Sequence, residues 1–287
     1  MNLAKAKELV AYIFAHPQVS EMAIKGDKLS STQTDHGMTH FLEVTSIARK
    51  ISTILNSRTS GFLSDWETEV VIPLASLLHD IGRAISVEDH ANAGAKWSLK
   101  FLRKVTLPGD TETLPMDTVK RICRIIACHR SNIVLHRPFN DACHAVVVCA
   151  DKFAGDEDRV RPGRAFVMGI LTFLGLSHIK LRHDGIHDRV NFAIKNVELE
   201  LRGSEFGPKL TIDPRVCEGR LILDTYSDRY LACHLAAKYL GLEFRLETVA
   251  KSVYGIFAKL RNAIGFGSAT VTERYAYNQE TQQWLIS

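Results

Sequence analysis

Six imidazole and carboxylate side chains stand at the ends or on the inner faces of apolar segments in the first part of the chain. They are His40, His79, Asp80, His90, His129 and Asp151. A buried carboxylate without a partner is costly, and a set of such groups is costlier still. A divalent cation removes this cost, because it binds imidazole nitrogen and carboxylate oxygen together at about 2.0–2.2 Å. The residue types therefore predict a metal site.

The adjacent pair His79 and Asp80 lies in LLHDIGRA, directly after the apolar run VVIPLASLL. Neighbouring residues on a helix point about 100° apart, since there are roughly 3.6 residues per turn. Both can bind one ion only if it lies near the helix surface with other helices around it. We expect His40 and Asp151 to reach that ion from two further helices.

Two more histidines extend this hypothesis to a second ion. His90 and His129 could hold it together, with Asp80 as the bridge between the two ions. Taken singly, either histidine fits equally well as an ordinary buried residue with a hydrogen-bond partner.

Helices are expected to carry all of these groups. Apolar side chains recur every three to four residues over 2–15 and 38–57, and DTVKRICRIIACH from 117 and residues 139–153 also read as helices. The capping box of Ser64 and Glu67 opens a helix from 65 to about 80, which stops near Gly82. Pro73 either kinks this helix or marks its true start. A second capping signature, Ser86 with Asp89, opens a helix to about 105.

The pattern changes near residue 195. NVELELRG alternates strictly between apolar and charged residues, which is typical of a half-buried strand, and KLTID at 209–213 is its expected hairpin partner. A helix over about 217–240, a strand over 242–249 and a strand pair on either side of Asn278 follow. The fold class is therefore mainly α, a helical bundle over 1–190 with a smaller α+β subdomain over 191–287.

Composition narrows the class of protein. The chain has 287 residues, 46% hydrophobic and 24% charged, enough to bury a sizeable core. A net charge of +4 with scattered basic residues favours neither a nucleic-acid nor a membrane-surface partner. The six cysteines form no CxxC pair, so we expect reduced thiols and a cytoplasmic protein. The longest apolar stretch, AFVMGILTFLGL, is too short to span a bilayer, and the amphipathic start of the chain does not read as a signal peptide.

The order His40, His79-Asp80, Asp151 resembles the H…HD…D signature of the HD superfamily of metal-dependent phosphohydrolases. The contexts agree over roughly residues 30–165: LLHDIGR, then H-x-x-x-G-A at 90–95, a helix ending in a histidine, and an apolar helix ending in ADK. Members with two extra histidines tend to hold two metals, which implies a binuclear site here. The stretches ADKFAGDEDRVR and HDGIHDRVNFAI resemble, more loosely, an uncharacterised bacterial and archaeal subgroup of HD hydrolases.

The chain departs from the HD subclass that cleaves cyclic dinucleotides. Arg130 follows His129 where that subclass has a second histidine, and no GYP stretch is present. The further HD pairs, His183-Asp184 and His187-Asp188, lack a preceding apolar helix and read as surface or turn. His36, before Gly37, is expected to cap the start of its helix, near the site.

The resemblance implies hydrolysis of a small phosphate ester, such as a nucleotide, by water activated on one or two divalent ions (Fe, Mn, Mg, Zn, Co or Ni). Asp80 and Lys152 are the catalytic candidates, and the substrate phosphate needs cations. Arg83, Arg130 and Arg159 are the candidates for that role, although a solvated surface charge is the simpler interpretation of each. Two alternatives are a di-iron oxygenase of the same superfamily and a non-catalytic nucleotide-binding module. A homodimer is possible, with the C-terminal part at its interface.

Overall fold

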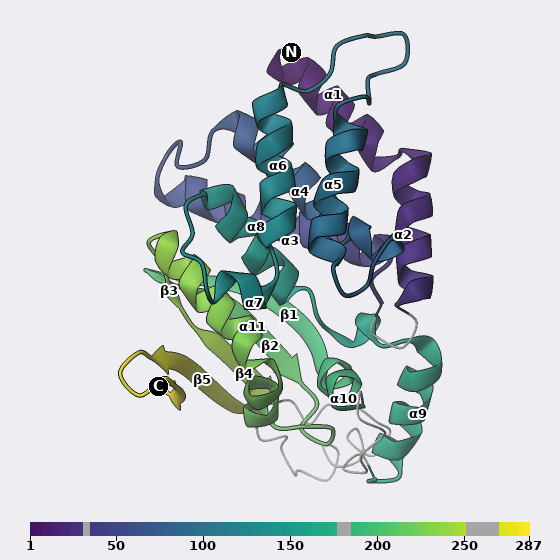
Figure 1. Ribbon diagram of the computed structural model, residues 1–287. Helices are drawn as coiled ribbons and strands as arrows, with labels where there is room; N and C mark the ends of the chain where they lie inside the picture. Colours follow the sequence, from purple (N-terminus) through teal and green to yellow (C-terminus); the bar gives the residue numbers. More distant parts are fainter. Residues whose placement is uncertain (31–34, 177–184, 251–269) are drawn as a thin grey trace. The chain divides into compact units, whose positions relative to one another are not determined.

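The computed structural model describes residues 1–30, 35–176, 185–250 and 270–287. The chain divides into two compact units, of which the first extends to Ala154 and the second begins at Gly155. The first unit is helical and the second combines helices with a sheet (Figure 1). The predicted class, a mainly α protein with a smaller C-terminal α+β part, is confirmed.

Helices of the first unit pack around one apolar helix. They are α1 (Leu3–Phe14), α2 (Pro17–Leu29), α3 (Met38–Arg58), the π-turn η1 (Glu67–Val71), α4 (Ile72–Leu78), the 3₁₀ turn η2 (Ile81–Ala84), α5 (His90–Leu102), α6 (Met116–Cys128), α7 (Ser131–Val134) and α8 (Ala142–Phe153). Every residue of α4 is buried, and this helix contacts α1, α3, α6 and α8 (Figure 1). A helix that is apolar on all sides belongs in the core, which explains this central place.

Pro73 marks the start of α4. The predicted capping box is present: Ser64 N donates to Glu67 Oε2 at 2.8 Å, and Glu67 N donates to Ser64 Oγ at 3.3 Å. The chain then widens into η1, where Ile72 N donates to the carbonyl of Glu67, and α4 begins with Pro73 in its first turn. Proline has no N–H to donate, so the i→i+4 ladder is interrupted here, and the helix expected from residue 65 continues to Leu78 with the π-turn η1 inserted ahead of Pro73.

The start of α5 also differs from the expectation. Asp89 N donates to Ser86 Oγ at 3.1 Å, so the Ser86 signature forms, but Asp89 is the N-cap and the helix begins at His90. The helix ends at Leu102, earlier than the expected residue 105, because the chain turns at Arg103.

The second unit contains the short turn η3 (Glu157–Arg159), α9 (Pro162–Phe173), α10 (Gly185–Ala193) and α11 (Gly219–Tyr239) with six strands in one sheet, among the described residues. The strands are β1 (Ile194–Arg202), β2 (Glu205–Ile212), β3 (Glu243–Phe244), β4 (Leu246–Ala250), β5 (Val271–Asn278) and β6 (Gln283–Ile286). β1–β2 and β5–β6 are the expected antiparallel pairs. β2 and β4 run parallel, which requires a crossover, and α11 supplies it.

The boundary drawn from the sequence at residues 190/191 falls within α10, close to the start of the first strand, whereas the compact units divide after Ala154. The difference concerns α9 and α10. Helix α10 packs on η3, α9, α11 and β1, so it is grouped with the sheet although it is a helix. Periodicity shows that a segment is helical and carries no information on which neighbours it packs against.

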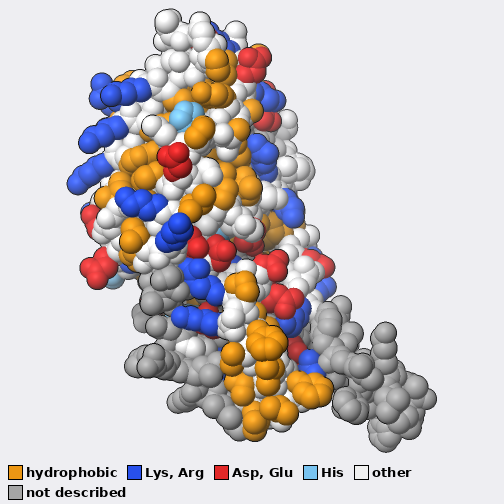
Figure 2. All heavy atoms as spheres, turned by 90° about the vertical axis from the view of Figure 1, so that its right-hand side faces the viewer, with side chains coloured by type: hydrophobic (Ala, Val, Ile, Leu, Met, Phe, Trp, Pro, Cys, Tyr) orange, Lys and Arg blue, Asp and Glu red, His pale blue; other side chains and the backbone are white. Residues whose placement is uncertain are grey.

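Helix α9 keeps an apolar face exposed in the second unit, visible in the lower part of Figure 2. Its exposed side chains include Phe166, at 70% relative exposure, and Phe173, at 76%. None of the described helices is both long and apolar enough to cross a membrane. All six cysteines are free, as expected.

Candidate metal centre

The six side chains singled out from the sequence lie together in the first unit. We call His40, His79, Asp80, His90, His129 and Asp151 the histidine–aspartate cluster. Each of them is at least nine-tenths buried, with relative exposures between 0% for His79 and 9% for Asp151. Buried polar groups at this density require either mutual hydrogen bonds or a cation.

Three helices, α3, α4 and α8, supply the first half of the cluster. Helix α4 ends at Leu78, so His79 and Asp80 follow it as the C-cap residue of α4 and the N-cap residue of η2. His79 Nε2 lies 3.6 Å from Asp151 Oδ1, on α8, and His40 Nε2, on α3, lies 3.7 Å from the same oxygen. Ligand atoms of His40, His79 and Asp151 all lie within 4.8 Å of one another. The predicted convergence of the HD pair with His40 and Asp151 is therefore present.

Asp80 connects this half to the second one. Its Oδ2 lies 3.8 Å from His79 Nε2, while its Oδ1 lies 3.2 Å from His90 Nε2 and 3.4 Å from His129 Nε2. His90 is the first residue of α5 and His129 caps the C-terminus of α6. One carboxylate thus presents one oxygen to each group of histidines, the arrangement expected of a bridging ligand.

Three of the histidines are oriented in the same way. The Nδ1 atoms of His79, His90 and His129 lie 2.7, 2.8 and 2.7 Å from the backbone carbonyl oxygens of Ser76, Val87 and Ile126, three residues earlier in each case. A carbonyl oxygen only accepts, so each Nδ1 must carry the proton. In the neutral ring, Nε2 then keeps its lone pair, and all three Nε2 atoms face Asp80. A histidine that binds a metal through Nε2 has its other ring nitrogen held in this way.

The donor set fits a divalent metal ion. His79 Nε2 is fully buried and has no hydrogen-bond partner within the part of the chain that the structure describes. An imidazole nitrogen in that state costs free energy unless a proton or a cation occupies it. Imidazole and carboxylate ligands suit Zn²⁺, Fe²⁺, Mn²⁺, Co²⁺ and Ni²⁺, so the residue types do not choose among these metals.

Both carboxylates are held in the charged form that a metal requires. Burial opposes ionisation of Asp80, but the Arg83 guanidinium and His79 outweigh it and hold its pKa well below the usual range. Burial likewise opposes ionisation of Asp151, and the Lys152 ammonium with His40 holds the pKa of Asp151 well below the usual range. Arg83 Nε donates to Asp80 Oδ2 at 2.7 Å, and Lys152 Nζ lies 2.5 Å from Asp151 Oδ2.

The histidines respond differently to the same surroundings. Burial lowers the pKa of His90 to about 4 and also lowers the pKa of His129, which keeps both rings neutral near pH 7. At His79 burial acts in the same direction, but the charges of Asp80 and Asp151 outweigh it and raise the pKa. A proton on His79 and a divalent cation satisfy the same two carboxylates, so they compete for this place.

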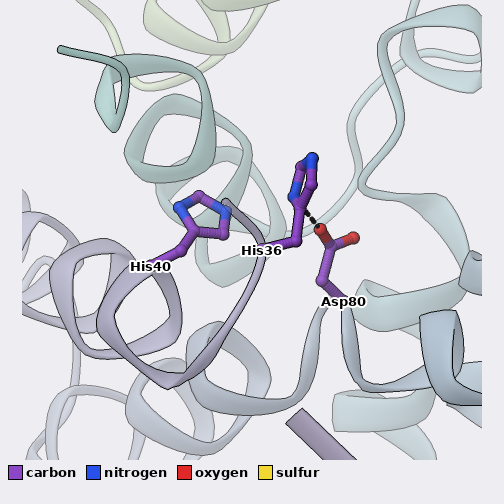
Figure 3. Close-up of side chains that lie close together, drawn as sticks. All are labelled: His36, His40 and Asp80. Carbon is purple, nitrogen blue, oxygen red and sulfur yellow. Dashed lines mark ion pairs between the residues drawn. The ribbon is translucent and has the colours of Figure 1, made fainter. Parts of the chain in front are cut away.

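His36 joins the cluster, and sequence reasoning assigned it a different role. Gly37, and not His36, is the N-cap of α3, while His36 Nδ1 lies 3.0 Å from Asp80 Oδ2. Figure 3 shows His36 and His40 extending into the same space from the start of α3, with the His36–Asp80 pair marked by a dashed line. Ligand atoms of His36, His40 and Asp80 also lie within 4.8 Å of one another. The spacing DHGMTH, two histidines four residues apart, was the available signal.

The candidate phosphate-binding cations have diverse surroundings. Arg83 is buried and bonded to Asp80, and Arg130 Nη1 donates to the carbonyl of Glu88 at 2.6 Å, next to the start of α5. Lys152 is paired with Asp151. Arg159 belongs to η3 in the second unit, where it is buried. Their roles toward a substrate stay predictions.

The additional HD pairs lie outside the cluster as far as they are described. His183 and Asp184 fall outside the described residues. His187 and Asp188 were expected at the surface or in a turn; they belong to α10, where His187 is exposed and Asp188 is not. Asp188 is buried and lies 2.5 Å from Arg164 Nη1, which accounts for the burial of its charge.

Comparison with protein-family models identifies part of the chain. Residues 37–156 match the family model described as "HD domain". This range contains the six helices α3 to α8 of the first unit and every residue of the histidine–aspartate cluster. The curated proteins give no match to the chain.

Proposed function

This chain is a member of the HD-domain superfamily through residues 37–156, and from that premise we propose that it is a phosphohydrolase. HD domains are usually metal-dependent hydrolases. The proposed substrate is a small phosphate ester, a nucleotide or another phosphomonoester or diester. The proposed cofactor is one or two divalent metal ions.

One observation carries the proposal. Three Nε2 lone pairs, each oriented by an Nδ1–H bond to a backbone carbonyl, face a carboxylate that is held ionised. An ordinary core histidine uses its ring nitrogens to satisfy protein groups, whereas these three leave one nitrogen directed at a shared point. The arrangement supports ligation of a cation and leaves hydrolysis as the chemistry to be tested.

The bound metal would supply a water-derived nucleophile near neutral pH and neutralise charge on the phosphoryl oxygens. His79, His40 and Asp151 would hold one ion, and His90 with His129 would hold a second, while Asp80 presents one oxygen to each. Arg83 keeps Asp80 ionised and fixes its orientation. Lys152 does the same for Asp151, and its ammonium is the predicted partner of a substrate phosphate oxygen.

A hydrolysis screen tests the proposal. Nucleoside mono-, di- and triphosphates, sugar phosphates and phosphodiesters are incubated with the full chain and, separately, Mn²⁺, Mg²⁺, Fe²⁺, Zn²⁺, Co²⁺ or Ni²⁺, and phosphate release is measured. We expect a metal-dependent activity that falls at least about 100-fold in Asp80→Asn, which keeps the shape of the side chain and removes its charge. Phosphate release that is equal in Asp80→Asn would contradict the proposal.

The same preparation addresses the alternatives. Iron that changes colour on exposure to oxygen, without phosphate release, would favour the di-iron oxygenase. A nucleotide that binds with no turnover under any metal would favour the non-catalytic module. The cytoplasmic location and the homodimer stay predictions, and light scattering of the purified chain measures the second of them.

A further inference from the structure

A pocket lies in the first unit, apart from the histidine–aspartate cluster. Its volume is about 730 Å³, within the range of roughly 300–1,000 Å³ typical of small-molecule sites. It is formed by α1, the start and middle of α2, the last turns of α5 and the residues just after α5. No member of the cluster is among its lining residues.

Aromatic rings form one wall of this pocket. Trp97 and Phe101 are one helical turn apart on α5 and stack with ring centres 4.8 Å apart and planes inclined by 17°. His16 contacts Phe101 edge to face at 5.0 Å, and Tyr12 contacts His16 in the same manner at 5.5 Å. His16 Nδ1 accepts a hydrogen bond from Gln18 N at 3.2 Å, which fixes the ring. The wall is therefore preformed, and it consists of the faces and edges of these aromatic rings.

Lysines border the aromatic wall. Lys25 on α2, Lys100 on α5 and Lys104 beyond it line the pocket, and none of them forms an ion pair within the described residues. Glu21 is the one lining acid, so three lysines and one glutamate together contribute a charge of +2 to the pocket. The side of the first unit where α2 lies shows apolar side chains between Lys and Arg side chains in the upper part of Figure 2.

We propose that this pocket binds a nucleotide, that is, an organic phosphate that carries a flat aromatic base. Bases stack on aromatic side chains with little regard to sequence, and ammonium groups pair with phosphate oxygens. Gln18 and Thr106 supply amide and hydroxyl groups that can bond the edge of a base. An inorganic anion would leave the aromatic wall unused, and an uncharged ring would leave the lysines unused.

The pocket and the cluster share helix α5. His90 is its first residue, and Trp97, Lys100 and Phe101 lie on its later turns. The proposed ligand therefore contacts the helix that carries a candidate metal ligand, although the two sites have no residue in common. The inference goes beyond the proposed function and does not depend on it.

Isothermal titration calorimetry of the full chain tests the pocket without hydrolysis. The Asp80→Asn variant is titrated in EDTA with AMP, GMP, CMP and UMP, and separately with adenosine and ribose 5-phosphate. We expect saturable binding of at least one nucleotide at one site per chain. We expect the nucleoside and the sugar phosphate to bind at least about tenfold more weakly, because each retains half of the contacts. Absence of binding by all four nucleotides would overturn the proposal.

Variants locate the site. Lys100→Ala with Lys104→Ala should weaken nucleotide binding at least about tenfold, and Trp97→Ala should do the same. The matched control is Lys96→Ala, an exposed lysine of α5 that does not line the pocket. If Trp97→Ala unfolds, the single variant Gln18→Ala, at an exposed position of α2, replaces it as the second test of the pocket. Nucleotide affinity that is unchanged in the double lysine variant, with the far-ultraviolet circular dichroism also unchanged, would overturn the assignment.

Discussion

At the scale of single residues, the orientation of three imidazole rings distinguishes the cluster from a group of ordinary core histidines. His79 and His129 each follow the last turn of a helix, so the carbonyl three residues earlier is available to accept from Nδ1. Residue types and order were enough to predict the six members of the cluster. They could not predict the ring orientation, because it depends on where each helix ends to within one residue.

Removing either member of the HD pair should release the metal. His79→Ala deletes a ligand, and Asp80→Ala deletes the carboxylate that faces both groups of histidines, so we expect metal content and activity to fall together. Mass spectrometry of the purified variants measures the bound metal. His136→Ala, at an exposed histidine, is the matched control and should retain it. Unchanged metal content in both cluster variants would be incompatible with the assignment.

His36 should act through Asp80. Its ring lies 3.0 Å from Asp80 Oδ2, the position of a partner that orients a ligating carboxylate. Such partners typically contribute about 10–100-fold to metal affinity or activity. We expect His36→Ala to weaken metal binding by that factor and His36→Asn, which keeps a donor, to recover part of it. A competitive chelator titration measures the metal affinity of each variant. Equal affinity in wild type and His36→Ala would show that His36 has no such role.

Metal affinity should depend on pH with a definite sign. Burial alone would lower the pKa of His79, but Asp80 and Asp151 raise it above the ordinary value of 6.5, so its ring holds a proton below that raised pKa. The metal must displace this proton, which weakens binding as pH falls. We expect affinity at about pH 6 to be at least about tenfold lower than at about pH 8, by the same chelator titration. Equal affinities at the two pH values would contradict the raised pKa.

At the scale of elements, two glycines explain how α5 comes close enough for His90 to reach Asp80. A Cβ on Gly82, in η2, would collide with the backbone of His90 and Gly94. A Cβ on Gly94 would lie 3.1 Å from the backbone nitrogen of Gly82. The glycines of LLHDIGR and of H-x-x-x-G-A therefore face each other. The sequence presents these two motifs as separate, and only the fold shows that they form one contact.

Gly82→Ala should separate η2 from α5. We expect a loss of about 2–3 kcal/mol in the free energy of unfolding, because backbone atoms cannot move aside as a side chain can, and weaker metal binding through displacement of His90. Gly169→Ala, on α9 with nothing within 4 Å of the added carbon, is the control and should stabilise by up to about 1 kcal/mol. Chemical denaturation measures both, and a neutral Gly82→Ala would refute the close contact.

Other elements show which structural features can be predicted from the sequence. The capping box at Ser64, the buried run of α4 and the alternation in β1 were all readable, because each depends on near neighbours. The π-turn before Pro73 and the close contact at Gly82 were not, since they depend on how the chain accommodates a missing donor or a distant backbone.

At the scale of the whole molecule, the histidine–aspartate cluster belongs to the first unit alone. The family match and the apolar helices could be predicted from the sequence, whereas the grouping of α9 and α10 with the sheet could not, because it rests on long-range contacts. Arg159, a candidate for substrate binding, belongs to the second unit. Its role is therefore a question about the whole chain and not about the HD domain.

Metal should stabilise the folded chain by mass action. At a free metal concentration of 100 times Kd, a ligand that binds only the native state adds about 2.7 kcal/mol. We expect the thermal unfolding midpoint to rise with added metal and fall with EDTA in the wild type, and to be unaffected by either in Asp80→Asn. A midpoint that rises equally in both proteins would indicate that the metal binds elsewhere.

The most direct test of the central claim is anomalous X-ray diffraction from crystals of the chain loaded with Mn²⁺ or Zn²⁺. We predict an anomalous peak about 2.0–2.3 Å from His79 Nε2 and from a carboxylate oxygen of Asp80, with a second peak near His90 and His129 if two ions bind. A metal-loaded crystal whose anomalous density avoids the histidine–aspartate cluster would contradict the account.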